Sequence, residues 1–528
     1  MKLTGGQIIG KALAAYGVEH CAAIPGHGAW AMLDGLLEPG SEVPVIQVFH
    51  EQSAVHMADG YFRASGRPMA AMTSIGPGAT NTVIGLATAY ADSSSLILLT
   101  GGPAGHMRGH GTMQELDRRE DNAFPHVVAP VTKRHWEPHR VDELPSVMHR
   151  AFSAMLTGRP GPVHVEVPMD LQAEAADVEV HDLARRIPVG VIHPDPEAIR
   201  RAADLIATAE RPVLAVGGGT IMANASAALV RVAELLSIPV VTTWSGKGAI
   251  PEDHALSAGS VGQTGSTAAN GIAAGADLVI AVGCKFTDWS ASSYRKGVSF
   301  SIPPARLVQI DLEPHEIGKN YPVEVGIVGD ARSVLDALAS ELASLSPARD
   351  YRAGAYFAEL QDLKRQWAEH IRPDQESDHR PMQLSRAFAE LRKVLPRDGV
   401  VVTDSSSPQA HAMNEFPVYE PRTHVTDGCM QGIGFGVPAA IGVQIGAPGR
   451  KVVALVGDGS FLMTGTEMAA AAIMGVPVVA LVFNNGGWGA IANLQRNLFG
   501  ESRLINTLWR RRDGERFFAS IADVARGL

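Results

Sequence analysis

Short apolar runs alternate with helix-like segments along most of the chain. In the first part, the runs VPVIQVF (43–49), PMAAMTS (68–74), SLILLTG (95–101) and PVHVEVP (162–168) have the length of buried strands. The segments between them repeat apolar residues at helical spacing, beginning with an amphipathic helix at the N-terminus. Strands that alternate with helices predict parallel βαβ units, so residues 1–180 are predicted to form one α/β domain.

The same alternation occurs in two further blocks. The second block, 190–345, contains the runs RPVLAVGGGT, IPVVTTW, ADLVIAVGCKF and ARLVQIDLEP, and the third, 380–528, contains GVVVTD, RKVVALVGDG and VPVVALVFNN. A polar, proline-bearing stretch (171–198) is predicted to be a linker, and a charged stretch (345–380) is predicted to form a helix and a second linker; the two separate the blocks. The predicted fold class is therefore α/β, with three doubly wound parallel-sheet domains.

Composition narrows the function classes. Of 528 residues, 46% are hydrophobic and 19% are charged, which is typical of a soluble globular protein, and the net charge of −10 argues against nucleic acid as a partner. The three cysteines, Cys21, Cys284 and Cys429, lack CxxC spacing, so neither a disulfide framework nor a cysteine zinc site is expected, and a cytoplasmic location fits. We find no signal peptide and no apolar run long enough to span a bilayer, so no membrane association is expected.

Polar oxygens follow two neighbouring strands of the third block. Asp458 comes at the end of the strand VVALV, and Asn485 comes at the end of the next, VPVVALVF, after one crossover helix. Both are expected at the same edge of the sheet, where open α/β sheets bind ligands. A carboxylate and an amide oxygen suit Mg²⁺ or Ca²⁺, and Gly459 and Ser460 offer backbone N–H groups and a hydroxyl to a diphosphate. The alternative is that GDG is only a structural turn.

This pattern, GDG followed one helix and one strand later by NN, resembles the metal and diphosphate motif of thiamine diphosphate (ThDP) enzymes. The resemblance implies that Asp458, the side chain of Asn485 and the carbonyl of Gly487 hold Mg²⁺. It also implies that Gly457, Gly459 and Ser460 lie against the diphosphate.

A second motif lies in the first block, in VFHEQSAVHMADGYFRASGRPMAAMTSIGPGATN (48–81). Glu51 follows apolar Val48 and Phe49, and a desolvated carboxyl there suits proton exchange with a ring nitrogen; the alternative is a helix N-terminal acid. The stretch resembles the pyrimidine-domain motif of the acetolactate synthase and pyruvate oxidase branch. That resemblance implies that Glu51 bonds the aminopyrimidine ring and so activates the thiazolium carbon. The matching loops contain Gly76, Pro77, Gly78 and Asn81, and Pro25 and Gly26.

Further segments are similar to the same family. GIGFGVPAAIG (432–442) gives Ile433 the position that bends the cofactor, and the backbone near Gln431 is implied to receive its amino group. TDSSSPQ (403–409) implies that Ser406 and Ser407 contact the diphosphate, and MQELD (113–117) places Gln114 near the thiazolium. His27, with His106 and His110, offers acid–base groups there, although a surface role is the alternative for each histidine.

The resemblance to acetolactate synthases implies an enzyme that makes or breaks a C–C bond next to a carbonyl. Its partners are small molecules, a 2-oxo acid or acyl donor and a carbonyl acceptor. The chain is expected to form a homodimer or homotetramer in which Glu51 of one chain faces Asp458 of another. Lys285 and Trp289, in AVGCKFTDW (281–289), depart from the family pattern and argue against FAD or ADP in the central domain.

Several alternatives stay open at this point. The segments IPGHG and TSIGPGATN also resemble a ThDP hydrolase that opens a cyclic 1,2-dione, and sulfoacetaldehyde acetyltransferase and 2-hydroxyacyl-CoA lyase types are further possibilities. A non-catalytic ThDP-fold subunit and a nucleotide-dependent oxidoreductase are rivals from other classes. The resemblance also implies a further strand and helix beyond FFASIADVARGL, which leaves open a truncated chain or a shorter variant.

Overall fold

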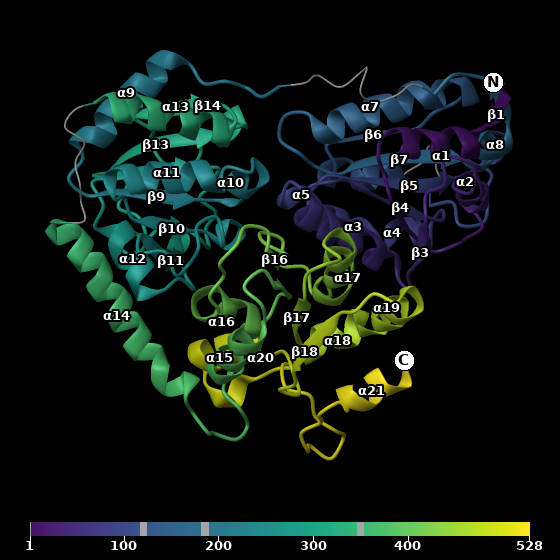
Figure 1. The fold of residues 1–528 in the computed structure, drawn as a ribbon. Coiled ribbons are helices and arrows are strands. Elements are labelled where there is room, and N and C mark those ends of the chain that lie inside the picture. Colours follow the sequence, from purple (N-terminus) through teal and green to yellow (C-terminus); the bar gives the residue numbers. More distant parts are fainter. Residues whose placement is uncertain (1, 117–123, 181–189, 346–352) are drawn as a thin grey trace. The chain divides into compact units, whose positions relative to one another are not determined.

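The computed structural model describes residues 2–116, 124–180, 190–345 and 353–528 (Figure 1). The chain divides into two compact units. The first contains residues 1–188, 401–406 and 427–528, and the second contains residues 189–400 and 407–426. Among the described residues, no helix has both the length and the apolar character needed to cross a membrane.

The N-terminal part of the first unit contains a six-stranded sheet in the order β3-β2-β4-β5-β7-β6, with every neighbouring pair parallel. The strands are β2 (Cys21–Ala23), β3 (Val45–Gln47), β4 (Met69–Thr73), β5 (Leu96–Gly102), β6 (Arg134–Trp136) and β7 (Val163–Pro168). All four expected strands are confirmed. The sequence did not predict β2 and β6, because strands of three residues are too short to give a continuous apolar run.

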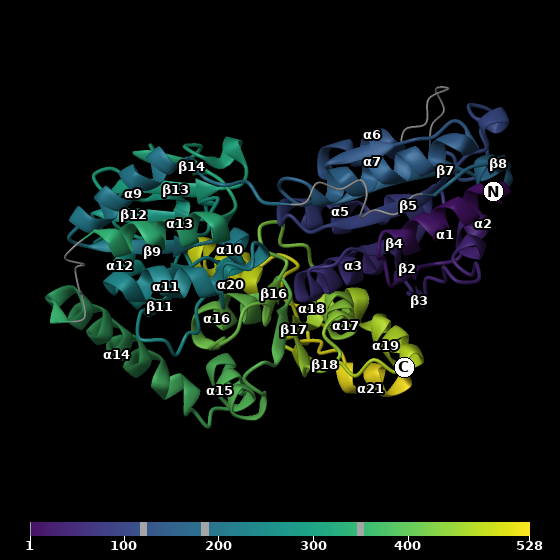
Figure 2. The same ribbon diagram turned by 45° about the horizontal axis from the view of Figure 1, so that its top comes forward.

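Helices cover both faces of this sheet (Figures 1 and 2). One face packs against α1 and α7, whose apolar residues join those of the strands in one core, and the other face packs against α3. The expected N-terminal helix begins after a capping box, in which the N–H of Gln7 donates to Thr4 Oγ1 at 3.2 Å. The helices are α1 (Gly5–Ala15), α2 (Trp30–Gly35), α3 (Glu51–Ser65), α4 (Pro77–Thr80), α5 (Val83–Ala91), α6 (Phe124–Val128), α7 (Leu144–Leu156) and α8 (Met169–Ala173).

The first predicted linker is partly wrong. Strand β8 (Ala175–Asp177) pairs antiparallel with β1 (Lys2–Thr4), so these residues belong to a small sheet of the first unit. A three-residue polar strand carries no pattern that separates it from a loop, and only pairing with the N-terminus defines it. Residues 181–189, also within that predicted linker, lie outside the described part of the chain.

The C-terminal part of the first unit contains the strands β15 (Val400–Thr403), β17 (Val452–Gly457) and β18 (Val479–Phe483), adjacent in that order. Strands β17 and β18 are parallel, with Gly457 opposite Phe483. The helices are α17 (Gly436–Gly446), α18 (Asp458–Thr464), α19 (Met468–Met474), α20 (Gly489–Phe499) and α21 (Ile521–Gly527). The GDG segment is not a separate turn: Asp458 directly begins α18, and Gly457 is its N-cap.

Helices α3 and α17 join the two parts of the first unit (Figure 2). Their backbones touch at two glycines. A Cβ atom on Gly60 would collide with the backbone of Ala439, and a Cβ atom on Gly442 would collide with the backbone of Met57. Glycine is therefore required at both positions because the helix axes cross without room for a side chain.

The second unit contains a six-stranded parallel sheet in the order β11-β10-β9-β12-β13-β14. The strands are β9 (Pro212–Val216), β10 (Val240–Thr242), β11 (Ser257–Ser260), β12 (Leu278–Val282), β13 (Arg306–Asp311) and β14 (Val325–Val328). The chain proceeds outward from β9 and then returns to β12 on its other side, which makes this a doubly wound sheet with its switch point between β9 and β12.

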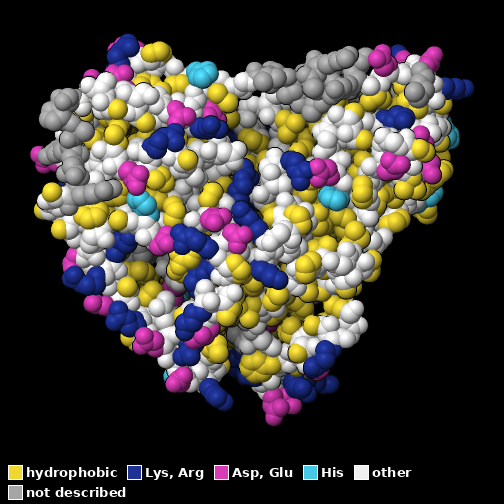
Figure 3. All heavy atoms as spheres, in the orientation of Figure 1, with side chains coloured by type: hydrophobic (Ala, Val, Ile, Leu, Met, Phe, Trp, Pro, Cys, Tyr) yellow, Lys and Arg dark blue, Asp and Glu magenta, His cyan; other side chains and the backbone are white. Residues whose placement is uncertain are grey.

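The other elements of the second unit are mostly helices. They are α9 (Pro196–Thr208), α10 (Gly218–Met222), α11 (Ser226–Leu236), α12 (Thr267–Ala274), α13 (Ala331–Ser344), α14 (Ala355–Gln375), α15 (Leu384–Val394), α16 (Ser407–Glu415) and the strand β16 (His424–Thr426). The charged stretch predicted as the second linker contains the long helix α14, which packs against α12. On the face drawn in Figure 3, Lys and Arg side chains lie among Asp and Glu side chains, so this face does not present a single sign of charge.

Candidate functional site

Two loops at one edge of the N-terminal sheet lie against each other. They follow the neighbouring strands β2 and β4. The N–H of Gly28 donates to Ser74 Oγ at 3.0 Å, and a Cβ atom on Gly26 would lie 2.5 Å from Ser74 Cβ. The loop that carries Pro25, Gly26 and His27 thus packs on the start of the Ser74–Gly78 loop, and glycine is needed at position 26 for that approach.

Glu51 lies at the same edge, in the first turn of α3. The side-chain amide of Asn81 donates to Glu51 Oε2 at 2.9 Å, and a Cβ atom on Gly78 would lie 3.3 Å from Glu51 Oε1. The carboxylate is half-buried. Both interpretations of Glu51 are therefore compatible with its position. As a helix N-terminal acid it begins α3, and as a proton-exchanging carboxyl it is oriented by the Asn81 side chain.

Gln114 is brought to this edge by a strained turn. Gly76 has a φ of 65°, and a Cβ atom there would collide with the carbonyl of Gln114, whose own φ is 68°. The Gln114 side chain is exposed. The loop before it is closed by Glu115, whose carboxylate accepts the N–H groups of Gly109 at 2.8 Å and Thr112 at 3.0 Å. Asp117, the last residue of MQELD, lies outside the described residues.

The histidines singled out by the sequence are exposed. His27 lies on the loop after β2, and His106 and His110 lie on the loop that precedes Gln114. The structure places all three on loops at one end of the N-terminal sheet, which is compatible with both of their sequence interpretations.

Asp458 is a buried carboxylate at the edge of the C-terminal sheet, 1% exposed. Its Oδ1 accepts the N–H of Gly459 at 2.9 Å, and its Oδ2 accepts the N–H of Gly486 at 2.6 Å and, more weakly, that of Gly487 at 3.4 Å. Among the described residues, no cationic side chain forms an ion pair with it. A buried carboxylate held only by amide N–H groups fits a hard cation, because the cation supplies the missing positive charge.

The two asparagines after β18 are held differently. Asn484 Nδ2 donates to the carbonyl of Ala519 at 2.8 Å, so Asn484 braces the C-terminal segment. The Asn485 carbonyl accepts from Arg516 at 2.6 Å, and the Asn485 amide packs against Gly489 at the start of α20. The Asp458 carboxylate lies at the start of α18, and Asn485 and Gly487 lie on the loop after β18; all three offer hard oxygen donors.

The predicted diphosphate contacts lie at the end of β17, at the start of α18 and after β15. The Ser460 hydroxyl donates to the carboxylate of Asp404, and the ring of Trp488 packs against Gly459, so the close approach that requires glycine there is made by an indole ring. Ser406 lies near Gly457 and donates through its hydroxyl to the Asp404 carbonyl at 2.9 Å. Ser407 begins α16 and belongs to the second unit.

Asp404 is a central residue that the sequence did not indicate. It follows β15 and is fully buried, and its two carboxylate oxygens accept the N–H groups of Gly434 at 3.2 Å and Gly436 at 2.6 Å. Burial raises the pKa of Asp404 to about 6. These bonds fix the turn that carries Ile433, whose carbonyl accepts from Gln52 Nε2 at 3.3 Å.

Gln431 stands at the other side of this turn. Its backbone has a φ of 55°, its Oε1 accepts from the Ser405 hydroxyl at 3.0 Å, and its Nε2 donates to the carbonyl of Gly428 at 2.6 Å. Side chains from the loop that follows β15, together with Gln52 of α3, thus hold the Gln431–Ile433 segment.

The switch point of the central sheet is closed by its own backbone. Gly217 N–H donates to the Val282 carbonyl at 3.0 Å, and Gly219 N–H donates to the Gly283 carbonyl at 3.2 Å. A Cβ atom on Gly217 would collide with Gly283. The N–H groups at the start of α10, where a Rossmann fold binds a pyrophosphate, are therefore occupied. Nearby, the indole N–H groups of Trp244 and Trp289 both donate to Thr264 Oγ1, at 3.1 and 3.2 Å.

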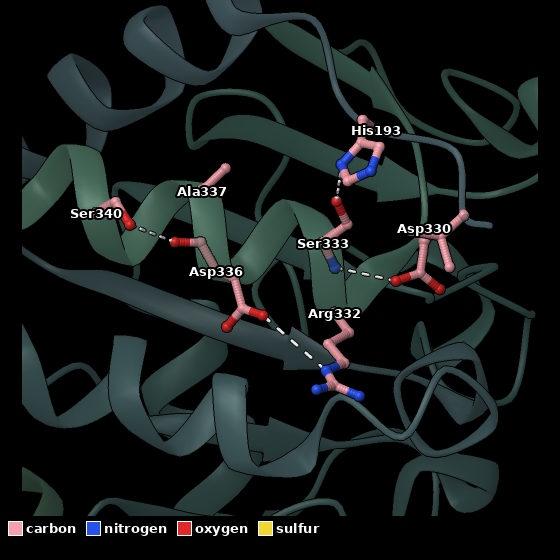
Figure 4. Close-up of a pocket in the computed structure, with 8 residues that line it drawn as sticks. His193, Asp330, Arg332, Ser333, Asp336, Ala337 and Ser340 are labelled. Carbon is pink, nitrogen blue, oxygen red and sulfur yellow. Dashed lines mark hydrogen bonds and ion pairs between the residues drawn. The ribbon is translucent and has the colours of Figure 1, made fainter.

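A surface pocket of about 460 Å³ lies elsewhere in the second unit (Figure 4). Its polar groups already bond one another: Ser333 Oγ lies 2.8 Å from His193 Nδ1, and Asp330 caps α13 by accepting the N–H of Ser333 at 3.0 Å. None of the predicted site residues lines it, so the central unit offers no competing catalytic cluster at this pocket.

Comparison with known proteins assigns all three sheets. Residues 3–121 match the N-terminal TPP binding domain of thiamine pyrophosphate enzymes, residues 199–338 match the central domain, and residues 404–525 match the C-terminal TPP binding domain. The chain is 36% identical to a probable acetolactate synthase large subunit of Methanocaldococcus jannaschii, over 94% of this chain and 83% of that protein. It is 35% identical to the acetolactate synthase large subunit of Corynebacterium glutamicum, over 96% and 78%. It is 31% identical to that of Haemophilus influenzae, over 94% and 84%.

Proposed function

From the premise that this chain belongs to the thiamine pyrophosphate enzymes and is a ThDP-dependent carboligase of the acetolactate synthase type, we propose that it joins a 2-oxo acid donor to a carbonyl acceptor. The thiazolium of ThDP supplies the carbon nucleophile and the electron sink for this chemistry. The dione hydrolase, acyltransferase and CoA lyase alternatives are not favoured, because the relatives reported above are acetolactate synthases.

The observation that carries the proposal is the contact between Glu51 and Asn81. Glu51 is the acid that exchanges a proton with the aminopyrimidine ring, and the Asn81 amide fixes the carboxylate for that exchange. Gly76, Pro77 and Gly78 form the adjoining wall, where the absence of a side chain at Gly78 leaves room beside Glu51 Oε1. Pro25 and Gly26 line the neighbouring loop.

Asp458, Asn485 and Gly487 are proposed to bind Mg²⁺ through oxygen atoms. The metal and the start of α18, with Gly457, Gly459 and Ser460, then bind the diphosphate. Because the Ser460 hydroxyl is taken by Asp404, its contribution is assigned to the backbone N–H, and Trp488 must give way for a phosphate to reach Gly459. Ser406 and Ser407 extend the same side of the site, and Gln431 and Ile433 receive the pyrimidine end.

Gln114 and His27 are proposed to face the substrate. Gln114 is held beside the GPG loop by Gly76, and His27 lies on the loop that packs on Ser74. Both side chains are exposed and both carry hydrogen-bonding groups that suit a carboxylate or carbonyl oxygen.

The active assembly is proposed to be a homodimer or homotetramer in the cytoplasm, with Glu51 of one chain opposite Asp458 of another. The three cysteines Cys21, Cys284 and Cys429, which are far apart in the sequence, suit a reducing compartment. The closed switch point between Gly217 and Gly283 supports a central domain that works without FAD or ADP. Purified enzyme with full activity and without flavin absorption is the expected result.

The experiment is a substrate panel. The enzyme, loaded with ThDP and Mg²⁺, is incubated with single 2-oxo acids, acyl-CoAs and cyclic diones, and cofactor adducts are trapped with acid and identified by mass spectrometry. We expect adducts from 2-oxo acids and a C–C coupled product when an acceptor is added. Adducts from diones or acyl-CoAs alone would overturn the assigned substrate class, and tight binding of NAD or FAD without ThDP binding would overturn the proposed reaction.

A further inference from the structure

Glu467 is a buried carboxylate that neither sequence motif includes. It ends the short helical turn between α18 and α19 and is fully buried. Both of its oxygens lie within hydrogen-bond distance of the Phe49 N–H, at 3.1 and 3.2 Å, and the backbone N–H of His50 also stabilises its charged form. A residue of the C-terminal part of the first unit therefore binds a segment of the N-terminal part.

The segment that Glu467 binds is the one that carries Glu51. Phe49 and His50 directly precede Glu51, and Ser53 follows it in the first turn of α3. His50 caps the helix as well, since its Nδ1 accepts the N–H of Gln52 at 3.1 Å. The backbone is thus fixed on both sides of Glu51, while the Glu51 carboxylate itself remains directed at Asn81.

Packing alone does not explain a carboxylate at this position. Among the described residues, Glu467 forms no ion pair, and burial raises its pKa. Burial of a carboxylate without a cation costs free energy unless hydrogen bonds offset it. A negative group at a helix N-terminus is also favoured by the helix dipole. The N–H groups of Phe49 and His50 and the start of α3 supply both conditions.

Glu467 also continues the segment that carries the metal ligand. Asp458 begins α18, the Ser460 hydroxyl bonds Asp404, and the Thr464 hydroxyl donates to the Gly434 carbonyl at 2.9 Å. Residues 458–467 therefore contact both the turn around Ile433 and the segment around Glu51.

We propose that Glu467 is a positioning residue that sets the orientation of Glu51 and couples it to the helical segment that starts at Asp458. The inference rests on the proposed function, because it assigns a role to Glu51 in cofactor activation. It assigns no contact between Glu467 and the cofactor or the substrate.

The test uses the holoenzyme and the variant Glu467→Gln, which keeps the shape but replaces one acceptor oxygen by an N–H₂ group that faces N–H donors. We measure ThDP affinity in the presence of Mg²⁺, the rate at which bound ThDP exchanges its C2 proton for deuterium, and kcat. We expect ThDP affinity close to that of wild type, with the exchange rate and kcat both reduced by about 10- to 100-fold. Glu467→Asp, which keeps the charge but withdraws the carboxylate from the Phe49 N–H, is expected to reduce exchange in the same direction by a smaller factor.

The control is Glu316→Gln, another buried carboxylate, in the second unit. It is expected to leave exchange unchanged even if it lowers the melting temperature. If Glu467→Gln and Glu467→Asp exchange at the wild-type rate per bound cofactor, the positioning role is overturned, and Glu467→Asp decides alone if Glu467→Gln does not fold. If the wild type shows no exchange, or Glu51→Gln retains it, the proposed function fails instead.

Discussion

The side-chain amide of Asn81 donates a hydrogen bond to the Glu51 carboxylate across 2.9 Å. Glu51 begins α3, which follows β3, and Asn81 caps the end of α4, which follows β4 of the same parallel sheet. An acid held in this way keeps one orientation without an ion pair. Its remaining oxygen faces the open side of Gly78. Glu51 is therefore the first residue to test by mutation.

Glu51→Gln is expected to lower kcat by about 10²- to 10⁴-fold, because an amide cannot exchange the proton that a carboxylate exchanges. ThDP binding, followed by calorimetry in the presence of Mg²⁺, is expected to persist. Asn81→Ala removes one oriented hydrogen bond and is expected to lower kcat by about tenfold. The matched control is Glu210→Gln, at an exposed position in the second unit, which leaves kcat unchanged. Full activity of the Glu51→Gln enzyme would contradict the role of this acid.

The adjacent asparagines after β18 give a matched pair of variants for the metal site. Asn485→Ala is expected to raise the Mg²⁺ concentration needed for half-maximal ThDP binding by about 10- to 100-fold, because one hard oxygen ligand is lost. Asn484→Ala loses only the bond to the Ala519 carbonyl and is expected to bind Mg²⁺ as the wild type does. The measurement is a Mg²⁺ titration of ThDP binding for both variants. Equal affinities would argue that Asn485 is not a ligand.

The sequence predicted those features that depend on local pattern. Long apolar runs such as β5 and β17 carry their own signal, and Asp458 and Asn485 were expected together because parallel neighbours end at the same edge, as the pairing of Gly457 with Phe483 now shows. The three-residue strands β2 and β6 carry no such signal, since they are defined by their neighbours.

Asp404 and Glu467 mark the limit of prediction within the site. Each is one acid among many in the sequence, and each gains its importance only from N–H and hydroxyl donors that arrive from distant segments. The same is true of Ser460, whose hydroxyl bonds Asp404, a partner that the sequence did not indicate. Periodicity and motif spacing cannot assign the partner of a side chain that is satisfied across the fold.

The close crossing of α3 and α17 predicts that alanine substitutions at two glycines differ strongly in their effect on stability. Gly442→Ala is expected to destabilise the enzyme by about 1–3 kcal/mol or more, because its new methyl group would meet the backbone of Met57, which cannot move without shifting α3. Gly449→Ala meets nothing within 4 Å and is expected to be neutral. Urea unfolding of the two variants measures the difference. Similar midpoints would show that the helices separate easily.

His56 predicts a pH dependence of stability. It is buried in α3, its Nε2 lies 3.1 Å from Gln52 Nε2, and its ring packs edge-on against Phe435. Burial lowers the pKa of His56 from 6.5 to about 4, although the nearby charge of Asp59 opposes the shift. Between these values the unfolded chain binds a proton that the folded chain does not, so the free energy of unfolding falls as the pH falls from 6.5 towards 4.

His56→Gln keeps a hydrogen-bond acceptor for Gln52 but cannot take up a proton. As the pH falls between the two values, we therefore expect the free energy of unfolding of the wild type to decrease by on the order of a few kcal/mol more than that of this variant. Asp404 acts in the opposite direction, because its raised pKa makes the folded state bind the extra proton, but it is present in both proteins and cancels in the difference. The measurement is urea unfolding at a series of pH values, with the exposed His379→Gln as control. Parallel pH profiles for wild type and His56→Gln would show that His56 takes up its proton at the same pH in the folded and the unfolded chain, which would contradict the lowered pKa.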